Sequence, residues 1–285
     1  MKSRYLPLLC LLLTGCIKDH WPGTPDPEVP PFLISRMIAV QHSGTPDPLP
    51  GEHPERFFKE VNEFHYNAFF KPESRYSYVA SGADTLALRL QVRDTLYYDT
   101  KHRVVQVDGY IPSQSGVRER KKFTYEGNDT LPATMQVWYS GMPEPDSLYF
   151  QGTTRFAYKT DTALMISVNA HGGLDTMFYI YAGGNFMRQY GTTGYEVDVY
   201  TTYDNATGIE HLIGLSHGLV FRLPVDNVKP PVLSRNNWTG EGLLTQVKTI
   251  AYLPGGNLVD SYTVTQNDQV PLTWKVRFEY FIPNP

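Results

Sequence analysis

Few side chains in this sequence of 285 residues have the type and spacing that chemistry requires. The histidines do not assemble into a metal-ligand pattern: His211 and His217 share a glycine-containing segment without the tighter spacing and nearby carboxylates of such sites. Motifs of nucleophilic hydrolases, zinc proteases and phosphate-binding loops do not occur in the sequence. We therefore predict no metal, no cofactor and no catalytic residue. Because Asp and Glu are frequent at expected turns, a glycoside hydrolase that uses two carboxylates from distant segments stays an alternative.

Cys16 is the most informative residue in the chain. It follows Leu13-Thr14-Gly15 at the end of an apolar, leucine-rich run, and Lys2 and Arg4 precede that run. This arrangement resembles the lipobox of bacterial lipoproteins, whose cysteine receives a diacylglyceryl group and becomes the first mature residue. The run is far shorter than the ~20 residues that span a bilayer, so it predicts a cleaved export signal. Since Cys10 would be removed with that signal, no intramolecular disulfide could form.

The lipobox resemblance implies a protein that its N-terminal lipid anchors in the outer membrane, at the cell surface or at the periplasmic face. Lys18-Asp19 is similar to a short charged signal for surface export, although Ile17 and His20 interrupt it. The chain carries 25 basic and 29 acidic residues, and Glu119 interrupts its one basic run at 118–122. We therefore expect the membrane as a partner, through the anchor, and no nucleic acid.

A short motif recurs along the chain, in which Asp is followed by Ser or Thr and then by an apolar residue. The hydroxyl residues of this motif are Thr85, Thr95, Thr130, Ser147, Thr162 and Thr176. One interpretation is structural: Asp ends a turn, and Ser or Thr begins the next strand. The other is that the motif resembles the O-glycosylation sequon of exported Bacteroidetes proteins. The two interpretations are compatible, because the edges of turns are exposed.

Aromatic residues are abundant, with 20 tyrosines, 14 phenylalanines and four tryptophans. Exposed aromatic rings can stack on sugars, so a glycan-binding role is an alternative function. The candidate stacking residues are Trp138, Trp238 and Trp274. The competing interpretation, which we favour, is that the fold itself needs aromatic residues next to its turns.

Three parts are expected: a signal peptide at 1–15, a flexible tether at 16–31 that follows the lipidated cysteine, and one β-rich domain at 32–285. The tether is rich in proline and contains Gly-Thr-Pro-Asp-Pro, a pentapeptide that recurs at 44–48. A first strand is predicted over 32–40. A short helix is predicted over 54–65, because Phe57, Val61 and Phe64 recur at helical spacing after Pro54.

The rest of the chain has a repeated pattern typical of β-hairpins. An aromatic residue and a tyrosine stand two positions apart before Asp, Asn or Gly, as in Phe123-x-Tyr125 and Phe156-x-Tyr158, and the chain closes with Phe278-x-Tyr280. Residues two apart share one face of a strand, and Asp, Asn and Gly suit tight turns. Each unit therefore predicts a hairpin with two aromatic side chains next to its turn. The segment around Tyr203-Asp204-Asn205 is predicted to be another such turn.

Tyr98-Asp99-x-x-x-Arg103-Val104 and its weaker copies resemble the tyrosine–aspartate (YD) repeats of bacterial surface proteins. Together with the lipobox, the early strand Ser35-Arg36-x-Ile38 and the Phe-x-Tyr ending, they resemble Bacteroidetes lipoproteins that carry a YD-like domain of unknown function, DUF4595. The resemblance covers residues 33–285, and it implies no catalytic residue.

We therefore predict an all-β protein, an antiparallel meander of repeated hairpins that curls into a half-open barrel with one short helix. A β-sandwich is the alternative fold. The predicted function is that of a non-enzymatic structural or binding module, anchored by lipid in the cell envelope. Its partner beyond the membrane would be a polysaccharide or another envelope protein. A glycan-binding accessory lipoprotein and a carboxylate-dependent hydrolase are the alternatives.

Overall fold

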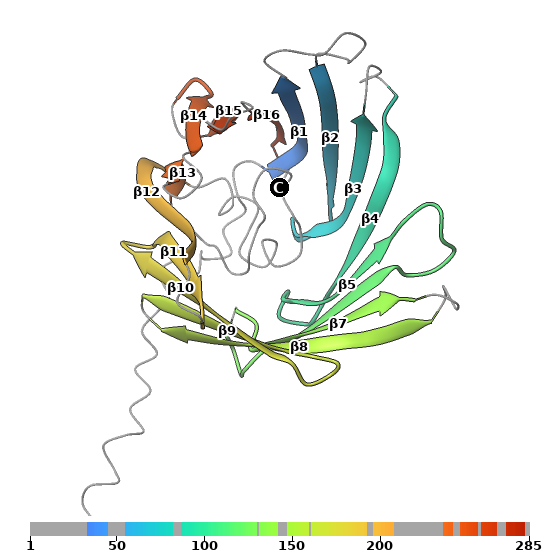
Figure 1. Cartoon of the computed structure of the whole chain (residues 1–285). Coiled ribbons are helices and arrows are strands. Elements are labelled where there is room, and N and C mark those ends of the chain that lie inside the picture. Colours follow the sequence, from blue (N-terminus) through green and yellow to red (C-terminus); the bar gives the residue numbers. More distant parts are fainter. Residues whose placement is uncertain are drawn as a thin grey trace, which may run out of the picture.

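The fold is seen in a computed structural model (Figure 1). It describes residues 33–44, 55–81, 87–129, 131–141, 147–159, 161–192, 196–207, 236–241, 246–255, 258–266 and 272–282. The described strands are β1 (Leu33–Gly44), β2 (Glu55–Tyr66), β3 (Pro72–Ser81), β4 (Arg89–Tyr98), β5 (Val104–Tyr110), β6 (Glu119–Thr124), β7 (Thr134–Ser140), β8 (Leu148–Lys159), β9 (Thr162–Asn169), β10 (Leu174–Ala182), β11 (Asn185–Gly191), β12 (Glu196–Thr207), β13 (Asn236–Glu241), β14 (Gln246–Tyr252), β15 (Val259–Gln266) and β16 (Leu272–Phe281).

The sheet is an antiparallel meander that closes on itself. Each strand pairs with the next along the chain, and β1 pairs with β16 to complete a barrel of sixteen strands. Figure 1 shows the strands surrounding a common interior. The predicted all-β meander is confirmed. The sheet closes further than the predicted half-open curl, and the alternative of a β-sandwich is wrong. Closure leaves the two outermost strands paired with each other, so neither is an exposed edge.

The helix predicted over 54–65 is wrong, because Glu55–Tyr66 forms strand β2. This strand pairs on one side with β1, where Val61 lies opposite Ile38, and on the other side with β3. Glu60 and Asn62 occupy positions on the inner face between Phe58 and Phe64. Because these inward positions are polar, the sequence does not show the alternation of apolar and polar residues that is typical of a strand. Pairing along both edges satisfies the backbone groups of the strand and outweighs a local helical pattern.

Alternation along each strand separates an inner from an outer face. On β4, Asp94 and Leu96 are buried whereas Arg93 and Tyr97 are exposed. The buried members of this alternation meet in two clusters, so their face is the interior of the barrel. The smaller cluster comes from β9–β11. The larger one includes Met37, Phe64, Leu96, Phe123, Phe156, Trp238, Val264 and Phe278.

A row of tyrosines lies at one end of the barrel, where β16, β2, β4, β6 and β8 end. The hydroxyl groups of Tyr66, Tyr98, Tyr125, Tyr158 and Tyr280, here called the tyrosine belt, each donate to a backbone carbonyl oxygen. The acceptors are Ile34, Pro72, Val104, Pro132 and Val259, in the same order. Each belt tyrosine therefore ties the end of one strand to the beginning of the strand before it. Burial raises the pKa of all five hydroxyl groups.

The repeated motif of the sequence builds this belt. A buried apolar residue stands two positions before each belt tyrosine, and these residues are Phe64, Leu96, Phe123, Phe156 and Phe278. The predicted hairpin with two same-face aromatic residues is thus confirmed at Phe123-x-Tyr125 and Phe156-x-Tyr158. It is wrong around Asp204, because β12 continues through Thr207. There the carboxylate accepts hydrogen bonds from Asn237 and Tyr252 instead of ending a turn.

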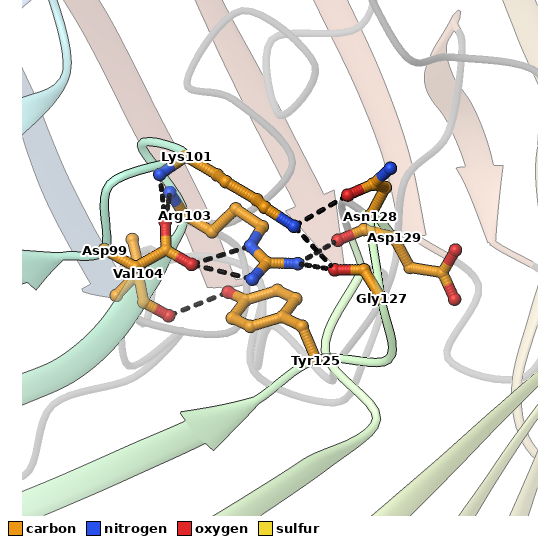
Figure 2. A network of polar contacts seen from close by, with 8 residues as sticks. All are labelled: Asp99, Lys101, Arg103, Val104, Tyr125, Gly127, Asn128 and Asp129. Carbon is orange, nitrogen blue, oxygen red and sulfur yellow. Dashed lines mark hydrogen bonds and ion pairs between the residues drawn. The ribbon is translucent and has the colours of Figure 1, made fainter.

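The Tyr-Asp…Arg motif closes the turn between β4 and β5, as Figure 2 shows. Asp99 Oδ1 accepts hydrogen bonds from the backbone N–H groups of Lys101 and Arg103, at 2.8 and 2.9 Å. Asp99 Oδ2 receives the guanidinium of Arg103 through Nε at 2.8 Å and Nη2 at 2.7 Å. Partial burial raises the pKa of Asp99, but the hydrogen bonds from Arg103 and Lys101 and the charge of Arg103 outweigh it, so the pKa lies below its usual range.

The same arginine also reaches the next hairpin. Arg103 Nη1 donates to the carbonyl oxygens of Gly127 and Asp129, at 3.1 and 3.0 Å, and its guanidinium lies 4.4 Å from the centre of the Tyr125 ring. Lys101 Nζ donates to the Gly127 carbonyl as well, at 3.0 Å. The motif therefore joins two neighbouring hairpins at the tyrosine-belt end, which is a structural role.

Candidate binding surface on the inner wall

One transverse row of the sheet carries most of the polar chemistry of the inner wall between β3 and β8. Cross-strand partners follow one another as Arg75–Asp94, Asp94–Gly109, Gly109–Glu119, Glu119–Tyr139 and Tyr139–Tyr149. Arg75 in turn lies opposite Phe64, a residue of the core, so the row faces the interior. We call Arg75, Asp94, Gly109, Glu119, Tyr139 and Tyr149 the inner row.

The buried end of the inner row is an ion pair. Arg75 Nε and Nη2 lie 2.8 and 2.6 Å from Asp94 Oδ2, and the two side chains are only 11% and 9% exposed. Burial raises the pKa of Asp94, and the charge and hydrogen bond of Arg75 oppose that rise. Removing one partner would leave the other charge buried and uncompensated, so each side chain requires the other.

Gly109 makes room for this ion pair. A Cβ atom at position 109 would lie 3.1 Å from Asp94 Oδ1 and 3.7 Å from the Cβ of Glu119. A larger residue would therefore crowd the carboxylate of Asp94 and fill the space between the two acidic side chains. The inner row thus has no side chain at β5, between Asp94 and Glu119.

The middle of the inner row is more accessible. Glu119 Oε1 accepts a hydrogen bond from the Tyr139 hydroxyl at 3.0 Å and lies 3.2 Å from Lys121 Nζ. The side chains of Glu119 and Lys121 are 31% and 22% exposed. A carboxylate, an ammonium and a phenol hydroxyl thus lie together at partly exposed side chains.

The open end of the inner row consists of two tyrosine rings. Tyr139 is 40% exposed and Tyr149 is 43% exposed, the second near the beginning of β8. A Cβ atom at Gly141 would lie 2.7 Å from two carbons of the Tyr149 ring, so the glycine lets this ring lie against the backbone. Flat aromatic surface next to a few polar groups is the composition typical of small-molecule binding sites.

A second polar group lies on the same face of β2 and β3. Glu60 Oε1 accepts hydrogen bonds from Asn62 Nδ2 at 2.9 Å and from Ser77 Oγ at 3.1 Å. Asn62 and Ser77 are cross-strand partners, and both are buried. This group extends the polar part of the inner wall towards β1.

The three tryptophans predicted to stack on a ligand lie in three different places. Trp138 is on the outer face, where it contacts the ring of Phe150 and the ammonium of Lys122. Trp238 is buried in the core, 4.7 Å from Lys248 Nζ. Trp274 packs against the core beside Phe58. The described structure therefore brings no two of them together as a platform.

The predicted modification sites also differ in their surroundings. Cys16, Thr85 and Thr130 lie outside the described residues. Ser147 directly precedes β8, and Thr162 begins β9 after Asp161, as the structural interpretation of the motif predicts.

At the other two sites that interpretation is wrong. Thr95 lies in the middle of β4 on the outer face, because its neighbour Asp94 belongs to the inner row. Thr176 lies inside β10 and is only 9% exposed, so modification of the folded chain there would require its side chain to be uncovered.

Two further findings concern the described residues alone. They contain no group of three or more His, Cys, Asp or Glu residues placed to hold a metal ion. Within the same residues, no helix has the length and apolar character needed to cross a membrane.

The inner row itself was not predicted. Its members come from six strands and have no common spacing, and Tyr139 and Tyr149 lack the aromatic-x-Tyr pattern of the belt. The usable signal is the pair Gly109 and Gly141, because a glycine inside or at the end of a strand often marks a close approach of another group.

Comparison with known proteins finds distant structural likeness. A porin-like protein from Bacteroides uniformis is 10% identical with a TM-score of 0.43, and the alignment covers 91% of this chain and 99% of that one. A porin-like protein from Bacteroides vulgatus is 10% identical with a TM-score of 0.37, over 87% and 98% of the two chains. A TcdB2-TccC3-TEV structure is 14% identical with a TM-score of 0.31, over 78% of this chain and 11% of that one. No family model and no curated protein matches the sequence. The resemblance to YD repeats and to DUF4595 stays a prediction.

Proposed function

We propose that this protein is a non-enzymatic, lipid-anchored module of the bacterial cell envelope, which binds a polar ligand on the inner row of its barrel. The observation that carries the proposal is the increase in side-chain exposure along this row. Exposure rises from the buried pair Arg75–Asp94, through Glu119, to the half-exposed rings of Tyr139 and Tyr149. A fixed charged end and an open aromatic end favour a ligand with hydroxyl groups and a flat apolar face.

A carbohydrate fits this description best, so glycan binding is the second, more specific form of the proposal. Tyr139 and Tyr149 would lie against the faces of the sugar rings, while Glu119 and Lys121 would exchange hydrogen bonds with hydroxyl groups. The tryptophans proposed for this role from the sequence are replaced here by two tyrosines on adjacent strands.

A carboxylate-dependent hydrolase is less well supported. Asp94 and Glu119 are the acidic residues of the row, one on each side of Gly109. Asp94 is held by Arg75, and Glu119 contacts both Lys121 and Tyr139. Contacts of this kind hold both carboxylates against neighbouring side chains, whereas a catalytic pair must be free to reach a substrate from both sides.

Charged residues on the outer face of β1–β6 and β16 favour a barrel that is exposed to water, rather than to lipid, along these strands. Arg36 lies 3.3 Å from Glu63 and 3.8 Å from Glu279, and Arg120 makes two contacts of 2.7 Å with Asp108. Arginine on a lipid-facing strand is destabilising by about 2–4 kcal/mol at the centre of a bilayer. Attachment through lipidated Cys16 would hold such a barrel at the membrane without placing these charges in lipid.

The binding proposal is tested with a glycan array on the purified mature chain. We expect binding that Tyr149→Ala abolishes. Tyr97→Ala is the matched control, because Tyr97 is 42% exposed but lies on the outer face of β4. Equal binding by the Tyr149→Ala variant, or equal loss in the control, would show that the inner row is not the site.

The anchor is tested separately. Metabolic labelling with a fatty-acid analogue should mark the wild-type protein, and Cys16→Ser should remove both the label and the protein from the membrane fraction. Label that persists on the Ser variant would contradict the proposed lipidation.

A further inference from the structure

The outer face of β9 and β10 is mostly apolar, with two threonines, Thr162 and the buried Thr176, among its residues, unlike the charged outer face of β4–β6. Cross-strand partners on this face include Leu164 with Phe178 and Val168 with Leu174. The neighbouring positions Ala163 and Tyr179 are buried in the core, so these partners point away from the interior. We call Leu164, Ile166, Val168, Leu174, Phe178 and Ile180 the outer apolar wall.

Exposure on this wall increases towards the barrel end opposite the tyrosine belt. Leu174 is 70% exposed and Val168 is 39% exposed, and both flank the hairpin that joins β9 to β10. On β8, Phe150 is 43% exposed on the same outer face as Trp138. Phe178 stacks on Tyr190 of β11, with ring centres 4.9 Å apart, which extends the apolar surface by one strand.

The size of the wall argues against a protein partner. The six wall residues, together with Thr162 and Thr176 at the remaining outward positions of the two strands, cover roughly 200 Å², from the strand spacing and rise. A stable protein interface buries about 800 Å² on each partner. A lipid surface demands no complementary shape, and a small apolar area suffices when an anchor already holds the protein beside it.

Positive charge borders the outer apolar wall. On the β8 side, the register places Arg155 beside Ile166 and Lys159 beside Thr162, and both cationic side chains are exposed. On the β11 side, Arg188 lies beside Ile180. An apolar stripe with basic residues along its borders is the composition that binds anionic lipid, because the cations meet phosphate groups while the apolar residues enter the interface.

We propose that the outer apolar wall is a second membrane contact, which seats the barrel sideways on an anionic lipid bilayer. The proposal rests on the proposed lipid anchor. The segment between Cys16 and Leu33 reaches about 50 Å when extended, at about 3 Å per residue. In the ring of sixteen strands β1 lies opposite β9, and strands about 4.8 Å apart with a tilt of about 40° enclose a barrel about 30 Å wide. The anchor can therefore reach the bilayer while this wall lies on it. The end of the barrel at which Tyr149 lies would then face along the membrane rather than into it.

The test is co-sedimentation of the mature chain carrying Cys16→Ser with vesicles of phosphatidylcholine, with and without phosphatidylglycerol. The Ser variant lacks acyl chains, so its vesicle binding, which we expect to be weak and measure over a series of lipid concentrations, reports on the wall alone. We expect binding to the anionic vesicles, and Leu174→Asp should weaken it by roughly tenfold because a carboxylate is repelled at an anionic apolar interface. Val247→Asp is the matched control, since Val247 is 52% exposed on the outer face of β14, far from this wall.

A second variant keeps the apolar side chains intact. Arg155→Glu should weaken binding to the anionic vesicles and leave binding to the neutral ones unchanged. The proposal is overturned if the Cys16→Ser chain without a further change does not bind the anionic vesicles at any lipid concentration. It is also overturned if Val247→Asp weakens binding as much as Leu174→Asp, or if Leu174→Asp instead dissociates a dimer in light scattering. A failed labelling of Cys16 would overturn the anchor, but it would leave the vesicle result standing.

Discussion

Two sets of tyrosines on the inner face of this barrel have opposite surroundings. In the tyrosine belt, Tyr125 and its counterparts are largely covered, and each hydroxyl group donates to a backbone carbonyl. In the inner row, Tyr139 donates to the carboxylate of Glu119, and the Tyr149 ring is nearly half exposed beside Gly141. The same side chain therefore closes one part of the barrel and offers a surface in another. The difference arises from what each hydroxyl group and each ring face meets.

Removing Asp94 should have the largest effect on stability, because it breaks the buried end of the inner row. Asp94→Ala leaves the Arg75 charge uncompensated, and we expect a loss of about 3–5 kcal/mol in the free energy of unfolding. Urea denaturation followed by circular dichroism measures it. The double variant Arg75→Met with Asp94→Leu should recover most of the loss, since an apolar pair of similar volume replaces the ion pair. A neutral Asp94→Ala would contradict this account.

Tyr125→Ala should have the next largest effect. The change removes a packed ring, its hydrogen bond to the Val104 carbonyl and the surface on which Arg103 lies. We expect a loss of about 2–4 kcal/mol, as for other large-to-small changes in cores. Tyr125→Phe separates the two contributions, because it keeps the ring and should lose only about 1 kcal/mol. A Phe variant as unstable as the Ala variant would mean that the hydroxyl group, not the ring, dominates.

The aromatic hairpins that carry Tyr125 and Tyr158 could be predicted from the sequence, whereas the hydrogen bonds of the belt and the inner row could not, for a physical reason. Phe123-x-Tyr125 and its copies are local: two residues on one face and an adjacent turn suffice to specify a hairpin. The contact between Asp94 and Arg75 depends on the register of β3 and β4, and that between Glu119 and Tyr139 on the register of β6 and β7. The register of each strand pair depends on the whole sheet, so it cannot be predicted from a short segment of the sequence.

The wrong helix has the same origin. Phe57, Val61 and Phe64 are spaced as on a helix, but the backbone groups of β2 form hydrogen bonds with the strands on both sides, β1 and β3. Closure of the barrel is also a property of the whole chain, because β1 meets β16 only after every hairpin has formed. The pattern of hairpins predicts a meander, whereas the number and tilt of its strands decide whether it closes.

Arg103→Lys tests the link between neighbouring hairpins, and we expect a loss of about 1 kcal/mol. The ammonium of lysine can hold Asp99 but cannot also bind the Gly127 and Asp129 carbonyls in the planar arrangement of a guanidinium. Thermal unfolding measures this loss. The matched control is Arg155→Lys, at an exposed outer position where the same change should be neutral. Equal effects at the two positions would contradict a special role for Arg103.

The lowered pKa of Asp99 predicts that the free energy of unfolding depends on pH through the tyrosine-belt end of the barrel. Its pKa is lowered in the folded protein, below an unfolded value of about 3.9. Asp99 therefore stabilises the fold above about pH 4, and this contribution is lost as the pH falls through the lower folded value. Unfolding curves between pH 5 and pH 2, compared with those of Asp99→Asn, measure it. The Asn variant should be less stable at pH 5, and the two curves should converge at low pH. A constant difference across the range would mean that Asp99 acts through its shape rather than its charge.

Tyr149→Ala should have the smallest effect on stability and the largest effect on ligand binding. The ring is already 43% exposed, so its removal should change the free energy of unfolding by about 0.5 kcal/mol or less, as for most surface substitutions. Gly141→Ala sharpens the test, because its new methyl group would overlap the Tyr149 ring and move it without removing it. Both variants should unfold like the wild type and bind the array ligand weakly, whereas Tyr125→Ala should unfold early. If Tyr149→Ala were as unstable as Tyr125→Ala, the inner row would be a second belt, and the distinction between a closing and a binding set of tyrosines would fail.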